Sequence, residues 1–162
     1  MDTSPYIYQI NLSPGGLPKL PVVSAKVVHA GIEGDSHRNR ELHGGPDRAL
    51  CLYAWEKVEA LQREGHAITA GAAGENLTIA GLPWDMMQPG DQLHIGAEVF
   101  IEVTSYCVPC RHNACWFVDG RYQRISQEHH PGWSRLYARV MVEGWVHQGD
   151  AVRVIHHARG GK

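Results

Sequence analysis

The sequence has no long hydrophobic run, no large excess of either charge and no signal-peptide pattern in its first ten residues. No apolar stretch approaches the roughly 20 residues that cross a bilayer, and the first ten residues have neither a basic start nor a continuous apolar segment. The 15 basic and 17 acidic residues give a formal charge of -2, which argues against a broad basic face for duplex nucleic acid. We therefore expect a cytoplasmic protein with no membrane or nucleic-acid partner.

Cysteine is also scarce, with four residues in a chain of 162. In the cytoplasm such cysteines are reduced thiols rather than disulfides. A chain of this length buries enough surface to fold without them. We expect one domain over residues 1–162, with a core over about residues 10–155.

Short stretches of alternating or apolar residues, separated by Gly and Pro turns, indicate a mainly β fold. Strands are predicted at residues 6–12, 25–30, 49–53, 75–80, 91–95, 98–104, 139–143 and 151–155, with helices over 54–64 and within 121–130. This pattern favours a closed or nearly closed β-barrel with a few flanking helices. The long connections 32–47, 65–74 and 105–135 carry most of the unusual polar residues, which predicts a site on loops at the barrel rim.

The first candidate site lies in residues 31–50. Its glycines allow a ligand to approach the backbone, and His37, His43, Asp47 and Arg48 supply donors and acceptors. Arg48 can bind a phosphate or carboxylate through two parallel hydrogen bonds. The alternative is a structural loop in which Asp35 and Asp47 stabilise turns.

A second candidate is the segment of residues 70–78, Ala-Gly-Ala-Ala-Gly-Glu-Asn-Leu-Thr. Its small residues would let backbone amides face an anion, but it is not the phosphate-binding loop of nucleotide triphosphatases. Glu75 could orient a neighbouring His or Arg. A plain turn before a strand is the alternative interpretation.

The third candidate is the cysteine cluster Cys107-Val-Pro-Cys-Arg-His-Asn-Ala-Cys115. A redox dithiol usually works at a helix N-terminus beside a parallel sheet, and the spacing is tight for a zinc knuckle. A single reactive thiol at Cys110, after Pro109 and beside Arg111, fits better. Cys51 suits a small buried hydrophobic residue, and Cys115 is open to the same interpretation.

Five motifs in order resemble the MOSC domain family, named after the C-terminal domain of molybdenum cofactor sulfurase. They are Gly31-Ile-Glu-Gly-Asp-Ser-His37, His43-Gly-Gly-Pro-Asp-Arg48 followed by Leu52-Tyr53, Gly74-Glu-Asn-Leu77 with Gly81-Leu82, Gly90-Asp91, and Glu102-Val-Thr104 with Pro109-Cys110. The resemblance implies a pyruvate-kinase-barrel-like fold with a cleft for molybdenum cofactor (molybdopterin). It also implies that Cys110 ligates molybdenum or carries sulfur, which suits a soft thiolate.

By this resemblance the remaining cofactor-binding residues are those of the first two candidate sites together with the neighbour of Cys110: Gly34, Asp35, His37, His43, Gly44, Gly45, Asp47, Arg48, Gly74, Glu75, Asn76 and Arg111. Many relatives have Arg where this chain has Cys107, so Cys107 is either a second working thiol or a packing residue. No pyridoxal phosphate site is evident in the chain. A sulfur donor such as a cysteine desulfurase, or a reductase, would therefore be a separate protein.

The leading hypothesis is a molybdenum-cofactor-binding MOSC protein in which Cys110 carries sulfur or ligates the metal. One alternative is a molybdenum-dependent reductase of N-hydroxylated bases and related compounds, working with a separate electron donor. A second alternative is a non-enzymatic binding module stabilised by zinc.

Overall fold

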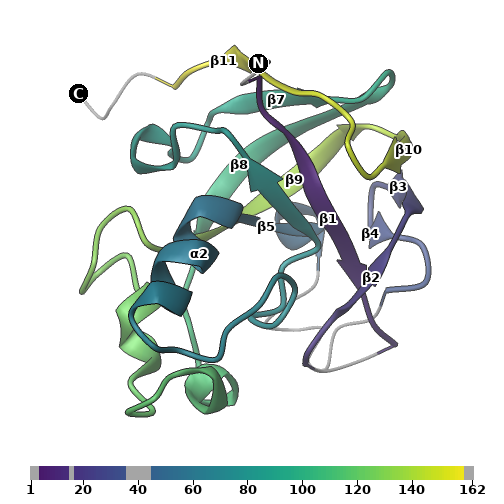
Figure 1. The fold of residues 1–162 in the computed structure, drawn as a ribbon. Coiled ribbons are helices and arrows are strands. Elements are labelled where there is room, and N and C mark those ends of the chain that lie inside the picture. Colours follow the sequence, from purple (N-terminus) through teal and green to yellow (C-terminus); the bar gives the residue numbers. More distant parts are fainter. Residues whose placement is uncertain (1–3, 15–16, 36–44, 159–162) are drawn as a thin grey trace.

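A computed structural model describes residues 4–14, 17–35 and 45–158 of the chain and is mainly β (Figure 1). Its strands are β1 (Tyr6–Leu12), β2 (Leu20–Val22), β3 (Ser24–Val28), β4 (Gly31–Ile32), β5 (Leu50–Ala54), β6 (Leu77–Ala80), β7 (Gln92–Ile95), β8 (Val99–Cys107), β9 (Arg135–Val142), β10 (Gly144–His147) and β11 (Val152–His156). Helix α2 (Trp55–Arg63) follows β5 directly. The mainly β class predicted from the sequence is confirmed.

Eight strands form one sheet in the order β11-β7-β8-β9-β5-β6-β1-β2. All neighbouring pairs are antiparallel except β5 and β6, which run parallel because α2 and the loop after it return the chain to the same end. A smaller sheet contains β10, β3 and β4. Within the described residues the β7–β8 pair is a hairpin that turns at Gly96.

The sheet curves so that β11 at one end approaches β1, the strand next to the other end, but a closed barrel stays a prediction. Tyr6 of β1 and Ala151 next to β11 form an isolated bridge. The Ile7 amide donates to the Asp150 carbonyl and the Val152 amide to the Pro5 carbonyl, both at 2.9 Å. No continuous ladder joins these strands in the described part of the chain.

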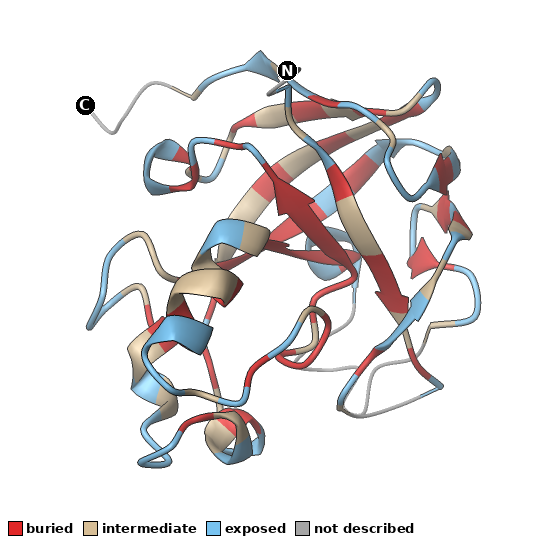
Figure 2. Ribbon diagram, viewed as in Figure 1, coloured by how far each residue is buried: buried red, intermediate tan, exposed pale blue. Residues whose placement is uncertain are grey.

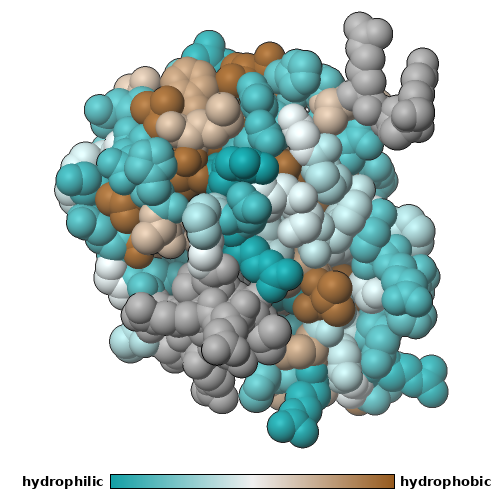
Figure 3. All heavy atoms as spheres, turned by 180° about the vertical axis from the view of Figure 1, so that it is seen from behind, coloured by the Kyte–Doolittle hydropathy of each residue, from teal (hydrophilic) through white to brown (hydrophobic). Residues whose placement is uncertain are grey.

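The core fills the space inside the curved sheet (Figure 2). Along β8 the burial alternates, with Val99, Ile101 and Val103 fully buried, as expected for a strand with one face in the core. All five residues of β5 are buried because both of its faces are covered. The face in the view of Figure 3 mixes hydrophobic with hydrophilic residues.

Helix α2 confirms the helix predicted over 54–64. It buries Val58 and Leu61 against the core and ends at Arg63, shortly before Gly65, whose φ of 97° favours glycine. No helix among the described residues has both the length and the apolar character that crossing a membrane requires.

Four 3-10 helices lie in the connections: η1 (Pro46–Arg48), η2 (Trp84–Met86), η3 (Arg111–Trp116) and η4 (Tyr122–Ile125). The last replaces the helix predicted within 121–130. Two predictions need correction. Cys115 is exposed on η3 rather than buried, and β9 begins at Arg135, inside the stretch assigned to a long loop.

Candidate functional site

Three neighbouring strands place two cysteines and an arginine on one side of the large sheet. Cys107 of β8 lies opposite Arg135 of β9, and Cys51 of β5 lies opposite Tyr137 of β9. Directly paired residues share a face, as do residues two apart on a strand. Leu50, Leu52, Leu136 and Ala138 occupy the other face and belong to the main core. We call the set Cys51, Cys107, Arg135 and Tyr137 the thiol face.

Arg135 is the buried cation of the thiol face and is 5% exposed. Its Nη1 donates to the Ala73 carbonyl at 2.5 Å, and its Nη2 to Asn113 Oδ1 at 3.4 Å. Its Nε has no hydrogen-bond partner among the described residues. Burial lowers the pKa of Arg135, but the thiols of Cys107 and Cys51 outweigh burial and raise it, so the guanidinium is charged.

Cys110 lies one residue before η3 and is half-buried. Its backbone amide donates to Asn113 Oδ1 at 3.5 Å, and Asn113 Nδ2 donates to the Ala73 carbonyl at 3.3 Å. The Asn113 side chain thus joins the Cys110 backbone, Arg135 and the loop of residues 71–76. The buried Asn113 side chain therefore holds the backbone of Cys110 beside residues 70–78, the second candidate segment.

Glu75 and Thr78 form a buried polar pair next to this loop, which we call the polar floor. Glu75 Oε2 accepts hydrogen bonds from the Gly71 amide and Thr78 Oγ1, both at 2.9 Å, whereas Oε1 has no partner in the described region. Burial raises the pKa of Glu75 despite these two donors. Gly74 has a φ of 102°, and a Cβ there would lie 2.9 Å from Leu17 Cδ2, so the loop requires glycine at this position.

Asn76 and Asp35 tie the two candidate loops together. Asn76 Oδ1 accepts from the Cys51 amide at 3.0 Å, and its Nδ2 donates to Asp35 Oδ2 at 2.9 Å. Asp35 also accepts from the Ser13 amide at 2.8 Å and from Lys19 Nζ at 2.7 Å. Both side chains of this ion pair are almost fully buried. Asp35 therefore holds the structure together with three protein donors, and its role as a cofactor ligand stays a prediction.

Helix η1 brings Arg48 to the edge of the thiol face. Its guanidinium lies 5.3 Å from the centroid of the Tyr137 ring, within range of a cation–π contact. The neighbouring Asp47 is exposed, its carbonyl accepts from Thr104 Oγ1, and its carboxylate lies 3.7 Å from Arg139 Nε. Arg48 thus contacts the thiol face, whereas the Asp47 side chain lies at the surface.

The remaining predicted site residues are more exposed or fall outside the described residues. Arg111 is exposed at the start of η3. Gly34 and Gly45 have φ values of 88° and 93° with open space where a Cβ would be. His37, His43 and Gly44 fall within residues 36–44, outside the described residues.

Sequence reasoning did not identify Arg135, Asn113, Tyr137 or Lys19. The apolar positions Leu136, Ala138 and Val140 do alternate with Tyr137 and Arg139, which was the available signal that β9 begins before residue 139. Among the described residues, no three His, Cys, Asp or Glu side chains are placed to hold a metal ion. A zinc knuckle built from the cysteine cluster is therefore not supported.

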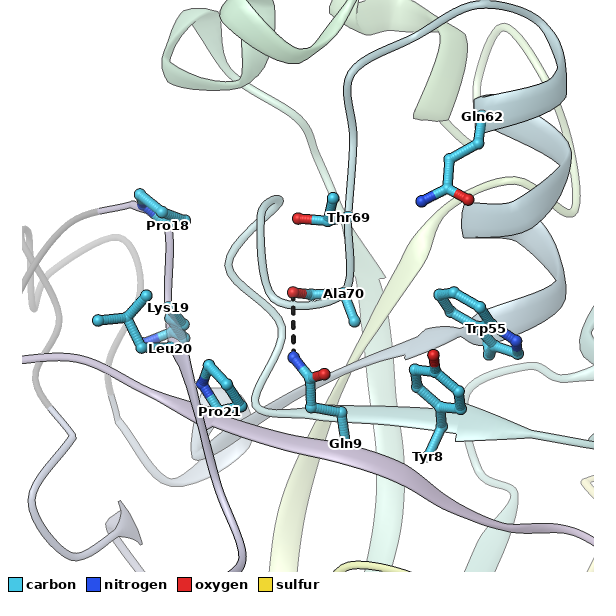
Figure 4. A pocket seen from close by; sticks show the side chains of 10 residues that line it. All are labelled: Tyr8, Gln9, Pro18, Lys19, Leu20, Pro21, Trp55, Gln62, Thr69 and Ala70. Atoms are coloured by element: carbon cyan, nitrogen blue, oxygen red, sulfur yellow. Dashed lines mark hydrogen bonds between the residues drawn. The ribbon is translucent and has the colours of Figure 1, made fainter.

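A groove of about 380 Å³ is lined by Thr69 and Ala70 of the loop of residues 65–74, together with residues of β1, β2 and α2 (Figure 4). Its wall includes Tyr8 stacked on Trp55, with ring centroids 3.9 Å apart. Gln9 donates to the Ala70 carbonyl and to Asn11 Oδ1. Asn11 in turn donates to Thr78 Oγ1, which bonds Glu75. A hydrogen-bond chain therefore connects this groove to the polar floor.

The Glu75→Gln variant is expected to be more stable than the natural protein at neutral pH. Because the folded-state pKa of Glu75 is raised, the natural protein loses stability as pH rises above about 4.5, whereas a neutral amide does not. Each tenfold change in the acidity constant corresponds to about 1.4 kcal/mol. Thermal unfolding between about pH 4.5 and pH 8 should show a difference that grows with pH. A constant or shrinking difference would contradict the raised pKa.

The fold is curved and mainly β. Its candidate site has a cysteine before a short helix, next to a buried arginine and a glycine-rich loop. These features define a small β domain with its site on loops. The model of the MOSC domain matches residues 39–153. The chain belongs to the MOSC domain family.

Relatives agree with this assignment. The chain is 31% identical to YflK of Bacillus subtilis over 153 residues, which is 90% of this chain and 66% of YflK. It is 35% identical to YiiM of Escherichia coli over 102 residues, which is 60% of this chain and 45% of YiiM. The crystal structure of YiiM from Geobacillus stearothermophilus matches with a TM-score of 0.72 and 27% identity, covering 96% of this chain and 77% of that one. The chain thus spans less than two-thirds of both relatives found by sequence.

Proposed function

We propose that the protein binds molybdenum cofactor at the site between Cys110, the thiol face and the loop of residues 71–76, with Cys110 as the thiol that meets the metal. The family membership supports a molybdenum cofactor as the ligand. The observation that carries the proposal is the donor set. The backbone amide of the half-buried Cys110 is joined through Asn113 to the buried guanidinium of Arg135, which keeps one N–H without a partner in the described chain.

These residues fit such a group chemically. A thiolate is a soft ligand suited to a molybdenum centre. The cofactor also carries a phosphate and a pterin with amide-like edges. The unpartnered Nε of Arg135 and the guanidinium of Arg48 are donors for the anionic part. Glu75 Oε1 lacks a partner among the described residues and is an acceptor for N–H groups.

Each side chain then has a separate task. Cys110 supplies the sulfur atom, and Asn113 fixes the backbone from which that sulfur projects. Arg135 keeps positive charge beside the site, and the Ala73 carbonyl holds its orientation. When bound, the cofactor supplies the metal centre for sulfur or two-electron chemistry. Sulfur or electrons would come from a separate donor protein.

The test is to purify the protein and its Cys110→Ala variant from a host with abundant cofactor, and to measure molybdenum and pterin per protein. Cys110→Ala should lower molybdenum by at least about tenfold, because loss of a ligand costs no less than loss of a supporting contact. Cys115→Ala is the matched control, since it removes an exposed thiol from η3, the helix that follows Cys110. Equal and negligible molybdenum in the natural protein and both variants would overturn the proposal.

Activity assays distinguish the two possible roles of Cys110, which are catalytic reduction and sulfur carriage. Reduction of an N-hydroxylated base requires an added electron donor, whereas sulfur carriage requires a donor that forms a persulfide on Cys110. Sulfur carriage would be favoured if a cysteine desulfurase transfers labelled sulfur to Cys110 and the protein reduces no N-hydroxylated base when electrons are supplied.

A further inference from the structure

Asn113 contacts both the backbone and the sulfur of Cys110. Its side chain is 1% exposed. Oδ1 accepts hydrogen bonds from the Cys110 amide at 3.5 Å and from Arg135 Nη2 at 3.4 Å, and Nδ2 donates to the Ala73 carbonyl at 3.3 Å. In return, the Asn113 main-chain amide donates to the Cys110 carbonyl at 2.9 Å and to the Cys110 sulfur. The two residues therefore hold each other in a reciprocal cap at the start of η3.

The partners of Asn113 require a short amide side chain in one orientation. The Cys110 amide and the Arg135 guanidinium can only donate, whereas the Ala73 carbonyl can only accept. A carboxylate would bring a second acceptor against the Ala73 carbonyl, and an apolar side chain would make none of the three bonds. Because all three bonds are long, we expect them to hold Cys110 together rather than singly.

The three cysteines of this segment differ in how the structure holds their sulfur atoms. Cys107 is 2% exposed at the end of β8, so packing surrounds it. Cys115 is exposed, and its thiol donates to the His112 carbonyl at 3.7 Å. Cys110 is half-buried and has an extended backbone at the point where the chain turns into η3. Of these three, Cys110 combines access to ligands with a sulfur held in a reciprocal cap.

We propose that Asn113 is a positioning residue that acts through Cys110, holding its sulfur in the one orientation in which the thiol meets the cofactor. The inference rests on the proposed function for the identity of the group that the sulfur meets. Without such contacts a half-buried cysteine side chain can occupy up to about three staggered orientations. Restricting the sulfur in advance removes the entropic cost of ordering it when a ligand binds. The same side chain bonds Arg135, so the guanidinium and the thiol keep a fixed relation.

The first experiment measures the orientation of the Cys110 sulfur in the metal-free protein, from NMR couplings across its Cα–Cβ bond. We expect one dominant rotamer in the natural protein and in Asn113→Asp, which keeps the acceptor for the Cys110 amide and for Arg135. We expect mixed rotamers in Asn113→Leu, which keeps the side-chain volume but makes none of the three bonds. The Cys110 amide should also exchange with solvent about tenfold faster in Asn113→Leu.

Tyr53→Phe is the control for a loss of stability alone. It removes the hydrogen bond from the buried Tyr53 hydroxyl to the Trp133 carbonyl, at 2.7 Å, and leaves the contacts of Cys110 intact. Both Tyr53→Phe and Asn113→Leu should unfold at a lower urea concentration, but only Asn113→Leu should mix the Cys110 rotamers. Mixed rotamers in the natural protein, or one dominant rotamer in Asn113→Leu, would overturn the inference. The measurement on the natural protein does not depend on whether Asn113→Leu folds.

The second experiment uses X-ray absorption to count the sulfur atoms around each bound molybdenum, in protein from a host with abundant cofactor. Asn113→Leu should show one sulfur fewer per metal than the natural protein and Asn113→Asp. This count does not depend on how much cofactor each sample retains, and an unchanged count in Asn113→Leu would overturn the inference. If no sample contains molybdenum, the proposed function fails, whereas the rotamers of the metal-free protein still decide whether Asn113 positions Cys110.

Discussion

Replacing Arg135 by Met is expected to reduce the free energy of unfolding by about 2–5 kcal/mol. Met retains much of the apolar volume but removes the charged donor to the Ala73 carbonyl and to Asn113 Oδ1, each of which keeps one longer hydrogen bond, from Asn113 Nδ2 and the Cys110 amide respectively. It also removes the cation that faces Cys107, so the pKa of Cys107 should rise and its reactivity at neutral pH should fall. Urea denaturation and the pH dependence of Cys107 alkylation measure the two effects.

Arg139→Met is the matched control, because Arg139 lies on the same strand. Its side chain is 47% exposed and its nearest ion pairs are 3.6 and 3.7 Å long. Such surface pairs contribute about 0–1 kcal/mol. If Arg135→Met were no less stable than Arg139→Met, Arg135 would not be the buried anchor that connects β9 to the loop of residues 71–76.

Asp35→Ala is expected to destabilise the protein by about 3–5 kcal/mol, because it leaves Lys19 as a buried cation without its partner. The Ser13 amide and Asn76 Nδ2 would lose their acceptor as well. Urea denaturation of the purified variant measures the change.

Two further variants test the cause of this loss. Asp85→Ala removes a carboxylate that also pairs with a lysine at 2.7 Å but is 74% exposed, so it should cost about 0–1 kcal/mol. Adding Lys19→Met to Asp35→Ala removes the stranded charge and should recover part of the stability. A double variant no more stable than Asp35→Ala would show that the lost hydrogen bonds, rather than the unpaired Lys19, carry the effect.

Much of the fold could be predicted because its strands follow local patterns. The alternation in residues 6–12 gives β1 with the same bounds, and the spacing of Trp55, Val58 and Leu61 gives α2. Strands β2, β4 and β10 were missed. The first two have only three and two residues, too few for a period to show.

The candidate site was predictable only in part. Motifs directed attention to Arg48, Glu75, Asn76 and Cys110, and the structure brings these near the thiol face or its adjoining loop. The partners that join them come from remote positions, as when Arg135 bonds Ala73 across 62 residues. No local pattern encodes such a contact, because it depends on how β5, β8 and β9 align in the sheet.

The parallel pairing of β5 and β6 has a consequence for the order in which the protein assembles. Strand β5, helix α2 and β6 are close in sequence, so this unit can form early, whereas β9 must arrive from far along the chain. Until β9 docks, the Ala73 carbonyl and Glu75 have no arginine beside them. The site is therefore completed at a late step of folding. If so, a partial opening that releases β9 should expose the β9 amides and the β5 amides that face it, while those of α2 stay protected from hydrogen exchange.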